Sequence, residues 1–275
     1  MTAPQDELPL RPRDRSRNRA RRRARGRVTV VGVCGELFIT AGILVLLFLG
    51  WQLWWNDAIL AKGQSSAAAD QNAQWAIKTS PEPSTAPSTA SPAPNAPATP
   101  AEPVVDTKTY DNAEVFAIMY VPRFGAGTQR NIAQGYGMDV LNSFKMGVGH
   151  YPSTQMPGAV GNFAVAAHRS AYGGGMHLID QFQVGDPIYI ETKDGWFTYR
   201  FRNLEYVTPT ATDVLDAIPR VSTKATTDRL ITLTTCNPLY STAERIAAYG
   251  TYESFRPGAG NPPPEIAADV AKWGK

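Results

Sequence analysis

The sequence has few of the side chains that bind metals or form disulfides. It contains two Cys and three His in 275 residues. It has no GxGxxG or GxxxxGK[ST] phosphate-binding loop, and His150, His168 and His177 include no closely spaced pair of metal ligands. We therefore expect no nucleotide, no metal and no other cofactor. Cys34 lies inside a long apolar run, so Cys236 is the one thiol outside it and no intramolecular disulfide is expected there.

Positive charge is concentrated at the N-terminus. Residues 1–27 hold ten Arg against Asp6, Glu7 and Asp14, a net charge of +7, whereas the whole chain carries +3. The rest of the chain is therefore mildly acidic, with a net charge of −4. Arg-rich tails are typical of nucleic-acid binding, but the apolar segment that follows favours a different interpretation.

A long apolar run follows the basic tail. Residues 37–55 are nineteen consecutive uncharged residues, close to the ~20 that a helix needs to cross a bilayer. Trp51, Trp54 and Trp55 gather at the far end, as an interfacial aromatic belt would. The run is longer than the core of a signal peptide and lacks a small-residue cleavage site. We therefore predict an uncleaved membrane anchor over residues 28–55, with a long buried core helix as the alternative.

The composition divides the chain into five parts. The positive-inside rule places the basic tail in the cytoplasm and everything beyond the anchor outside the plasma membrane. Residues 79–103 are mostly Pro, Ala, Ser and Thr, which cannot bury a core and favour an extended chain. The predicted order is a cytoplasmic Arg-rich tail, a transmembrane anchor, an extracytoplasmic stalk, a globular domain and a C-terminal tail, over residues 1–27, 28–55, 56–109, 110–256 and 257–275.

The sequence of the globular domain predicts a mainly β fold. Strands are predicted over residues 115–121, 161–168, 186–192, 196–207, 230–235 and 244–253, and short helices over 138–144, 176–183 and 214–218. Asp194-Gly195 predicts a type I′ hairpin turn. Strands at this short, turn-punctuated spacing favour a closed or nearly closed barrel over an open α/β sheet.

Cys236 lies at the end of a predicted strand, where the chain leaves the core. Residues 230–235 are apolar or β-branched, and Pro238 cannot donate to a sheet ladder, so the strand ends beside the cysteine. Arg245 lies near the start of the next strand-like run. If the two runs pair as a hairpin, the thiol and the guanidinium face the same mouth.

A reactive thiol needs a partner for its proton, and histidine is the usual one. His168 ends an alternating run in which Asn162, Ala164 and Ala166 share its face, and the small alanines leave room beside the ring for a bound chain. His150, in a loop framed by glycines and a proline, is a second candidate for the pocket.

Each of these residues also has a purely structural alternative. Cys236 could pack as a small buried hydrophobe, and His168 could be a surface residue satisfied by water. Arg245 could form a surface ion pair with Glu244 or Glu253. Spacing alone does not decide between these alternatives and a catalytic group.

TLTTC at 232–236, with Arg245 downstream and GNFAVAAHR at 161–169 upstream, resembles the signature of the sortases, membrane-anchored cysteine transpeptidases of Gram-positive bacteria. The resemblance extends over residues 147–200. The forms TLTTCNP and GVGHYP are most similar to class E, the housekeeping type of high-GC actinobacteria. Ala167 departs from the glycine that precedes the histidine in many class E members, and its methyl group would narrow the pocket.

The resemblance implies a mainly β fold, a closed barrel of about eight strands with short helices, and a two-step acyl transfer. Cys236 would attack the Thr–Gly bond of an LAXTG- or LPXTG-like sorting motif and form a thioester. His168 would protonate the leaving amine and then activate the incoming one. Arg245 would stabilise the substrate carbonyl and the oxyanion.

Substrate binding is expected to involve three further residues, His150, Thr235 and Asn237, of which Thr235 resembles the threonine that lines the oxyanion site of the family. The implied partners are exported proteins with a C-terminal sorting signal and the amino group of a peptidoglycan precursor, either lipid II or a cross-bridge. No nucleic acid is expected.

Two other functions are compatible with the residues. One is a surface cysteine hydrolase without ligation, although papain-type peptidases place Cys before His and the L,D-transpeptidase pattern of His-Gly close to Cys is absent. The other is a non-catalytic stalked surface module with a structural Cys236. Product analysis separates the first alternative from a transpeptidase, and thiol reactivity separates the second.

Overall fold

The structure is a computed structural model that describes residues 29–51, 55–79, 101–222 and 225–273. The predicted cytoplasmic tail, Trp54 and most of the Pro-rich segment lie outside these residues. The chain forms two compact units, Met1–Leu49 and Gly50–Lys275, which are described separately.

The first unit contains the helix α1, Val30–Gly50. Within the described residues, α1 is the one helix that is long and apolar enough to cross a membrane. None of its side chains is buried inside protein. A single N-terminal apolar helix is therefore present where the anchor is predicted, consistent with single-pass anchoring.

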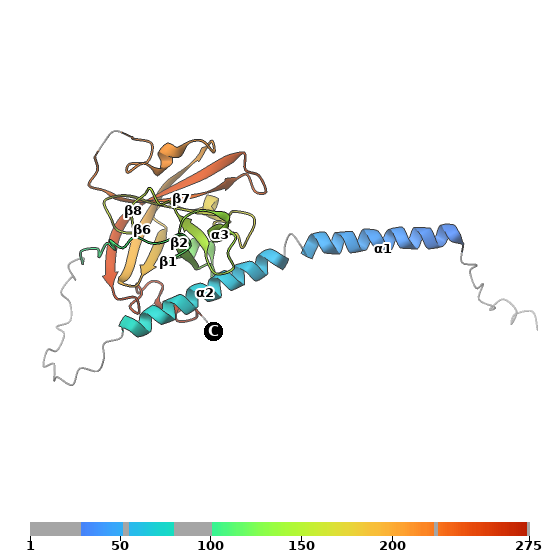
Figure 1. Cartoon of the computed structure of the whole chain (residues 1–275), viewed down its shortest axis with the longest axis horizontal. Helices are drawn as coiled ribbons and strands as arrows, with labels where there is room; N and C mark the ends of the chain where they lie inside the picture. Colours follow the sequence, from blue (N-terminus) through green and yellow to red (C-terminus); the bar gives the residue numbers. More distant parts are fainter. Residues whose placement is uncertain (1–28, 52–54, 80–100, 223–224, 274–275) are drawn as a thin grey trace, which may run out of the picture. The chain divides into compact units, whose positions relative to one another are not determined.

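The second unit is built on a closed barrel of eight strands in the order β1-β2-β3-β4-β7-β8-β6-β5, whose strands are drawn from green to red in Figure 1. The strands are β1 Val115–Tyr120, β2 Arg130–Gln134, β3 Gly147–His150, β4 Gly161–Ala167, β5 Pro187–Thr192, β6 Gly195–Val207, β7 Arg229–Asn237 and β8 Glu244–Pro257. The pairs β2–β3 and β4–β7 are parallel and the other neighbours are antiparallel. The predicted closed, mainly β barrel is confirmed.

Alternation along the strands fills the barrel interior. On β4, Phe163 and Val165 join the main core, and on β7, Ile231 and Leu233 do the same. Because successive side chains point to opposite faces of a strand, Thr232 and Thr234 of β7 lie on the other face. Packing of β7 in the core therefore fixes the position of its last residues at the edge of the barrel.

The hairpin between β5 and β6 differs from the prediction. Thr192 pairs with Gly195, so the central turn residues are Lys193 and Asp194. Neither of these has positive φ, whereas a type I′ turn requires positive φ at both central positions. The predicted turn type is therefore wrong, and Gly195, with φ of 154°, begins the second strand instead of ending the turn.

Short helices connect the strands. They are η2 Pro122–Phe124, α3 Met138–Leu141, η3 Ile179–Gln181 and η4 Thr212–Leu215. The last three fall where short helices are predicted, but each covers only three or four residues.

A longer helix, α2, spans Asn56–Thr79 and lies along one side of the barrel in Figure 1. It buries one face, which carries Leu60, Gln64, Ser65, Ala68 and Ala69. These residues are separated by four, one, three and one positions, a spacing that keeps them on a single face of a helix. The first part of the segment expected to be a stalk is therefore a helix that packs against the barrel.

Close approach of the helix depends on two glycines of the barrel. The buried side chain of Gln64 donates to the Ser143 carbonyl at 2.8 Å and to the Tyr172 carbonyl at 3.0 Å. A Cβ at Gly147 or Gly173 would lie within 2.7 Å of the Gln64 side chain, and both glycines have positive φ. Any larger residue there would push α2 away and strain the backbone.

The C-terminal segment also packs on the barrel. It contains α4, Ala267–Val270, and Ile266 is buried beside Tyr120, Tyr189 and Trp196 in a second apolar cluster. Trp273 stacks edge-on against Tyr120, with ring centroids 5.3 Å apart. The tail predicted beyond residue 256 therefore covers the outer face of β1, β5 and β6.

Candidate active site

Two parallel strands bring His168 and Cys236 to one edge of the barrel. β4 and β7 pair in register as far as Ala166 opposite Thr234. The same register, extended by two residues, sets His168 beside Cys236. Parallel strands end at the same edge of a sheet, so both side chains emerge where their strands leave the barrel.

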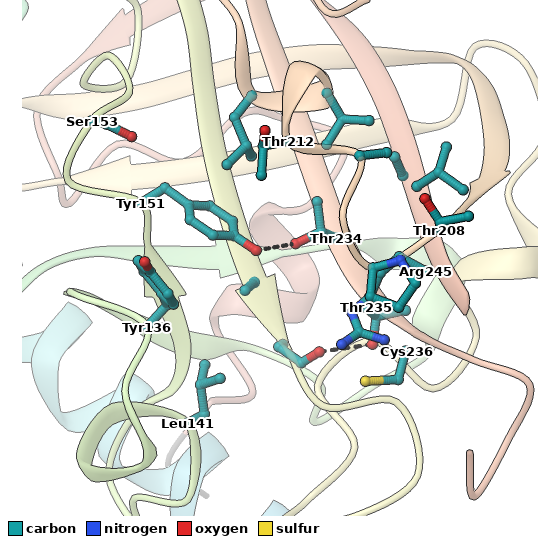
Figure 2. Close-up of a pocket in the computed structure, with 18 of the residues that line it drawn as sticks. Tyr136, Leu141, Tyr151, Ser153, Thr208, Thr212, Thr234, Thr235, Cys236 and Arg245 are labelled. Carbon is teal, nitrogen blue, oxygen red and sulfur yellow. Dashed lines mark hydrogen bonds between the residues drawn. The ribbon is translucent and has the colours of Figure 1, made fainter. Parts of the chain in front are cut away.

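An antiparallel neighbour brings Arg245 to the same place. Cys236 on β7 pairs directly with Arg245 on β8, and directly opposed residues project from the same face of a sheet. Figure 2 shows both side chains reaching the cavity, with the sulfur beside the guanidinium in this view. The predicted hairpin is therefore present, and the thiol and the guanidinium face the same cavity.

The cavity between these strand ends, called the main cavity below, has a volume of about 1040 Å³. Its walls come from the segment after β2 that includes α3, from the loop after β3, from the ends of β4, β7 and β8, and from the end of β6 with the residues up to 217 that follow it. His168, Cys236 and Arg245 all line it. Asn162, fully buried, donates from Nδ2 to the Val214 carbonyl at 3.2 Å and so holds the last wall in place.

The thiol of Cys236 is partly exposed and free. A cysteine that served as a small buried hydrophobe would be closed off from the cavity, so its position does not fit that structural alternative. It fits a thiol that meets a ligand in the cavity.

Arg245 is held by backbone oxygens. Its Nη1 donates to the carbonyls of Thr242 and Glu244, each at 2.9 Å. The two carboxylates considered as ion-pair partners are engaged elsewhere, because Glu244 accepts from Asn237 and Glu253 pairs with Arg200. Within the described residues Arg245 has no salt bridge. Its remaining donors are thus available to an oxygen in the cavity.

His168 is positioned by two residues that belong to no recognisable motif. Its Nε2 lies 2.8 Å from the Asn142 Oδ1, and its ring packs against Tyr172 with centroids 5.0 Å apart. An amide oxygen only accepts, so the ring donates from Nε2 and, when neutral, keeps its lone pair on Nδ1. Burial lowers the pKa of His168 below its ordinary value, and the Asp57 carboxylate opposes that shift. The lowered pKa favours the neutral imidazole, which is the form that can accept a proton.

Thr235 fixes the backbone on the histidine side. Its Oγ1 donates to the Ala167 carbonyl at 2.7 Å, which ties the residue before Cys236 to the residue before His168. The neighbouring Thr234 and Tyr151 hydroxyls lie 2.9 Å apart in the cavity wall, and Figure 2 shows this pair. Tyr151 belongs to the GVGHYP segment, but no pattern in the sequence distinguishes it as a residue of the cavity wall.

Asn237 lies behind the site instead of in it. It is absent from the lining of the main cavity. Its Nδ2 donates to Glu244 at 2.8 Å, and its Oδ1 accepts from Arg169. Arg169, which is buried, also pairs with Asp180 at 2.5 Å. Arg169, which follows His168 in the sequence, thereby contacts Asn237, which follows Cys236.

His150 does not reach the cavity. Its side chain is buried, its ring packs against Phe116 and Phe163, and it is not among the residues that line the main cavity. Both ring nitrogens have partners, Gln134 Oε1 at 2.7 Å and the Gln155 carbonyl at 3.1 Å. Burial lowers its pKa to about 4. His150 is therefore placed outside the lining of the main cavity, and its substrate-binding role stays a prediction.

The chain matches one family model, described as a sortase domain, over residues 119–253. It is 31% identical to Sortase SrtE1 of Streptomyces coelicolor (strain ATCC BAA-471 / A3(2) / M145) over 241 residues, or 85% of this chain and 60% of that protein. The chain thus spans less than two thirds of SrtE1. Sortase SrtE2 of the same strain is 31% identical over 82% of this chain and 83% of its own length.

Solved structures of sortases also match the chain. The SrtA sortase from Actinomyces oris has a TM-score of 0.54 and 31% identity, covering 60% of this chain and 92% of that one. Sortase E1 from Streptomyces coelicolor, solved with a tripeptide in the active site, has a TM-score of 0.51 and 32% identity, covering 56% of this chain and 97% of that one.

Proposed function

The chain belongs to the sortase family, a family of cysteine transpeptidases, and on that premise we propose that it is a membrane-anchored enzyme that transfers exported proteins to a cell-wall amine. One observation carries the proposal. A partly exposed thiol, an imidazole whose pKa is lowered by burial and an arginine that pairs with no carboxylate of the described residues meet at one cavity. This set matches what acyl transfer through a thioester requires.

In the first step, the Cys236 sulfur attacks the threonine carbonyl carbon of an LAXTG- or LPXTG-like motif, and the thiol proton passes to His168. Arg245 donates to the resulting oxyanion. The carbon–nitrogen bond to glycine then breaks, and His168 returns the proton to the leaving amine. A thioester on Cys236 remains.

In the second step, an amino group attacks the thioester carbonyl carbon and loses a proton to His168. The carbon–sulfur bond breaks, and the sulfur recovers a proton. The product has a new amide bond in place of the old one, so the thioester conserves the bond energy and no nucleotide is consumed. The proposed acceptor is the amino group of a peptidoglycan precursor, either lipid II or a cross-bridge.

We propose that α1 holds this enzyme in the plasma membrane with its N-terminus in the cytoplasm. Ten arginines precede the helix, and the positive-inside rule keeps such a segment on the cytoplasmic side. The barrel would then face the cell wall, where both substrates are found.

Product analysis tests the proposal. The full chain in detergent is incubated with an LAXTG or LPXTG peptide, with and without triglycine amide, beside a Cys236→Ala control. We expect a ligated peptide from the wild type and none from the control. Free acid as the sole product in the presence of the amine would instead identify a hydrolase.

A further inference from the structure

A second hollow adjoins the catalytic residues. It has a volume of about 460 Å³ and is called the side groove below. His168, Cys236 and Thr242 line both the side groove and the main cavity. The thiol therefore lies between two hollows, and an enzyme that joins two substrates at one sulfur requires access for both.

The two hollows have different charged side chains. Arg245 and Asp216 line the main cavity and not the side groove, while Asp57 lines the side groove and not the main cavity. Among the described residues that line the side groove, Asp57 is the one carboxylate. Arg169 also lines it, but that guanidinium is buried and paired with Asp180 at 2.5 Å. The exposed charge of the side groove is therefore negative.

Asp57 comes from α2, outside the barrel. It lies in the first turn of the helix, seven residues before Gln64 and so on the same face. Gln64 is bound to the Ser143 and Tyr172 carbonyls, and the neighbouring Ser65 carbonyl accepts from Gln129 at 3.3 Å. These contacts fix α2 on the barrel, and the first turn of this helix places Asp57 in the lining of the side groove. The carboxylate also acts on His168, because it raises the pKa of that ring against the lowering by burial.

From this arrangement we infer that the side groove receives the amine acceptor and that Asp57 of α2 attracts its ammonium group. This inference rests on the proposed transpeptidase function and assigns the second substrate to a place on the molecule. Asp57 is a binding residue for the cationic form. The bound ammonium group first loses one proton to solvent water, and the resulting neutral amine attacks the thioester and passes a second proton to His168. The main cavity, which Arg245 lines, then binds the sorting signal.

Competition between two nucleophiles for one thioester tests the inference. Both products form from the same thioester, so their ratio does not depend on the rate of the first step. The full chain in detergent is given an LAXTG peptide, triglycine amide and hydroxylamine together. The amino group of triglycine amide is largely protonated at neutral pH, and hydroxylamine is uncharged. The quantity measured is the ratio of triglycine product to hydroxamate.

For Asp57→Asn we expect this ratio to fall about three- to fivefold, the scale of one partly exposed charge pair. Asp57→Lys should lower it further, by about tenfold. Asp70→Asn is the matched control, because Asp70 lies on the same helix, is exposed and lines neither hollow. Its ratio should equal that of the wild type.

An unchanged ratio in both Asp57 variants would overturn the inference while the proposed function stood. Equal losses of both products would also overturn it, because they would show that Asp57 acts on the first step through His168. A wild-type chain that formed neither product would overturn the proposed function and this inference with it.

Discussion

At the scale of single residues, the guanidinium of Arg245 lies at the main cavity with donors left over for a substrate oxygen. Arg245→Ala should lower kcat/KM by roughly 100-fold, or about 3 kcal/mol, the cost of losing one oxyanion donor. The measurement is the rate of peptide cleavage by the full chain. Arg200→Ala is the control, because Arg200 is paired with Glu253 and lies outside the main cavity. Equal activity in the two variants would remove Arg245 from the mechanism.

Arg245, Cys236 and His168 could all be predicted from the sequence as neighbours. Each stands at the end of a strand, and strand ends can be predicted from proline, polar residues and alternation. The structure places all three at the main cavity. Their proposed roles remain to be tested by mutation.

His150 shows the limit of prediction from local sequence. Glycines and a proline around it indicated a loop, but Gly147–His150 is the strand β3. Pairing with distant strands decided its orientation, and no local pattern reports that pairing. Asn142 and Tyr172, which position His168, were missed for the same reason, because they approach it from other parts of the fold.

At the scale of elements, α2 is the main difference from expectation. Its buried face carries Gln64, Ser65, Ala68 and Ala69 together with the single large apolar residue Leu60. Small and polar residues give a weak hydrophobic pattern, so the sequence could not distinguish this docked helix from a solvated one. The strands were predictable because their β-branched and aromatic runs are distinctive.

Docking of α2 can be tested by one substitution. Ala68→Arg should lower the free energy of unfolding by about 3 kcal/mol, because the site is fully buried and offers no room for a charged side chain. Thermal unfolding of the full chain in detergent measures the effect. Ser66→Arg places the same side chain on the exposed face of the helix and should be close to neutral. Equal melting temperatures would mean that α2 is not docked in solution.

A buried carboxyl beneath α2 makes stability depend on pH. Glu191 of β5 is fully buried, and its Oε1 accepts from Asn72 of α2 at 2.8 Å. Its Oε2 has no partner among the described residues. Burial raises its pKa from an ordinary 4.5 to about 8. The folded chain therefore keeps this proton over a pH range in which the unfolded chain has lost it.

The sign of the pH dependence follows from linkage. Below the unfolded pKa the carboxyl is protonated in both states, and its stabilising contribution is fully present. As the pH rises toward about 8, the unfolded state ionises first and stability is lost. Glu191→Gln should flatten this decline in melting temperature between about pH 5 and pH 8. Glu253→Gln, at a partly exposed ion pair, should keep it. A wild-type melting temperature that rises over this range would contradict the assignment.

At the scale of the whole molecule, the sequence predicted a closed barrel and an N-terminal apolar helix, but not which strands pair to close the barrel. The barrel closes through β1 and β5 and contains two parallel pairs. These are long-range pairings, which turn and strand patterns do not encode. The apolar helix α1 was predictable because a run of nineteen uncharged residues has about the length of a membrane span.

The proposed function of the whole molecule depends on a thioester between Cys236 and a sorting peptide. Intact-mass spectrometry of the full chain, incubated with an LAXTG or LPXTG peptide, tests this step directly. We expect an acyl adduct on the wild type that is absent from Cys236→Ala and that triglycine amide removes as a ligated product. The absence of an adduct with either peptide, together with a native Cys236 that resists alkylation, would contradict the proposed function and favour a non-catalytic surface module.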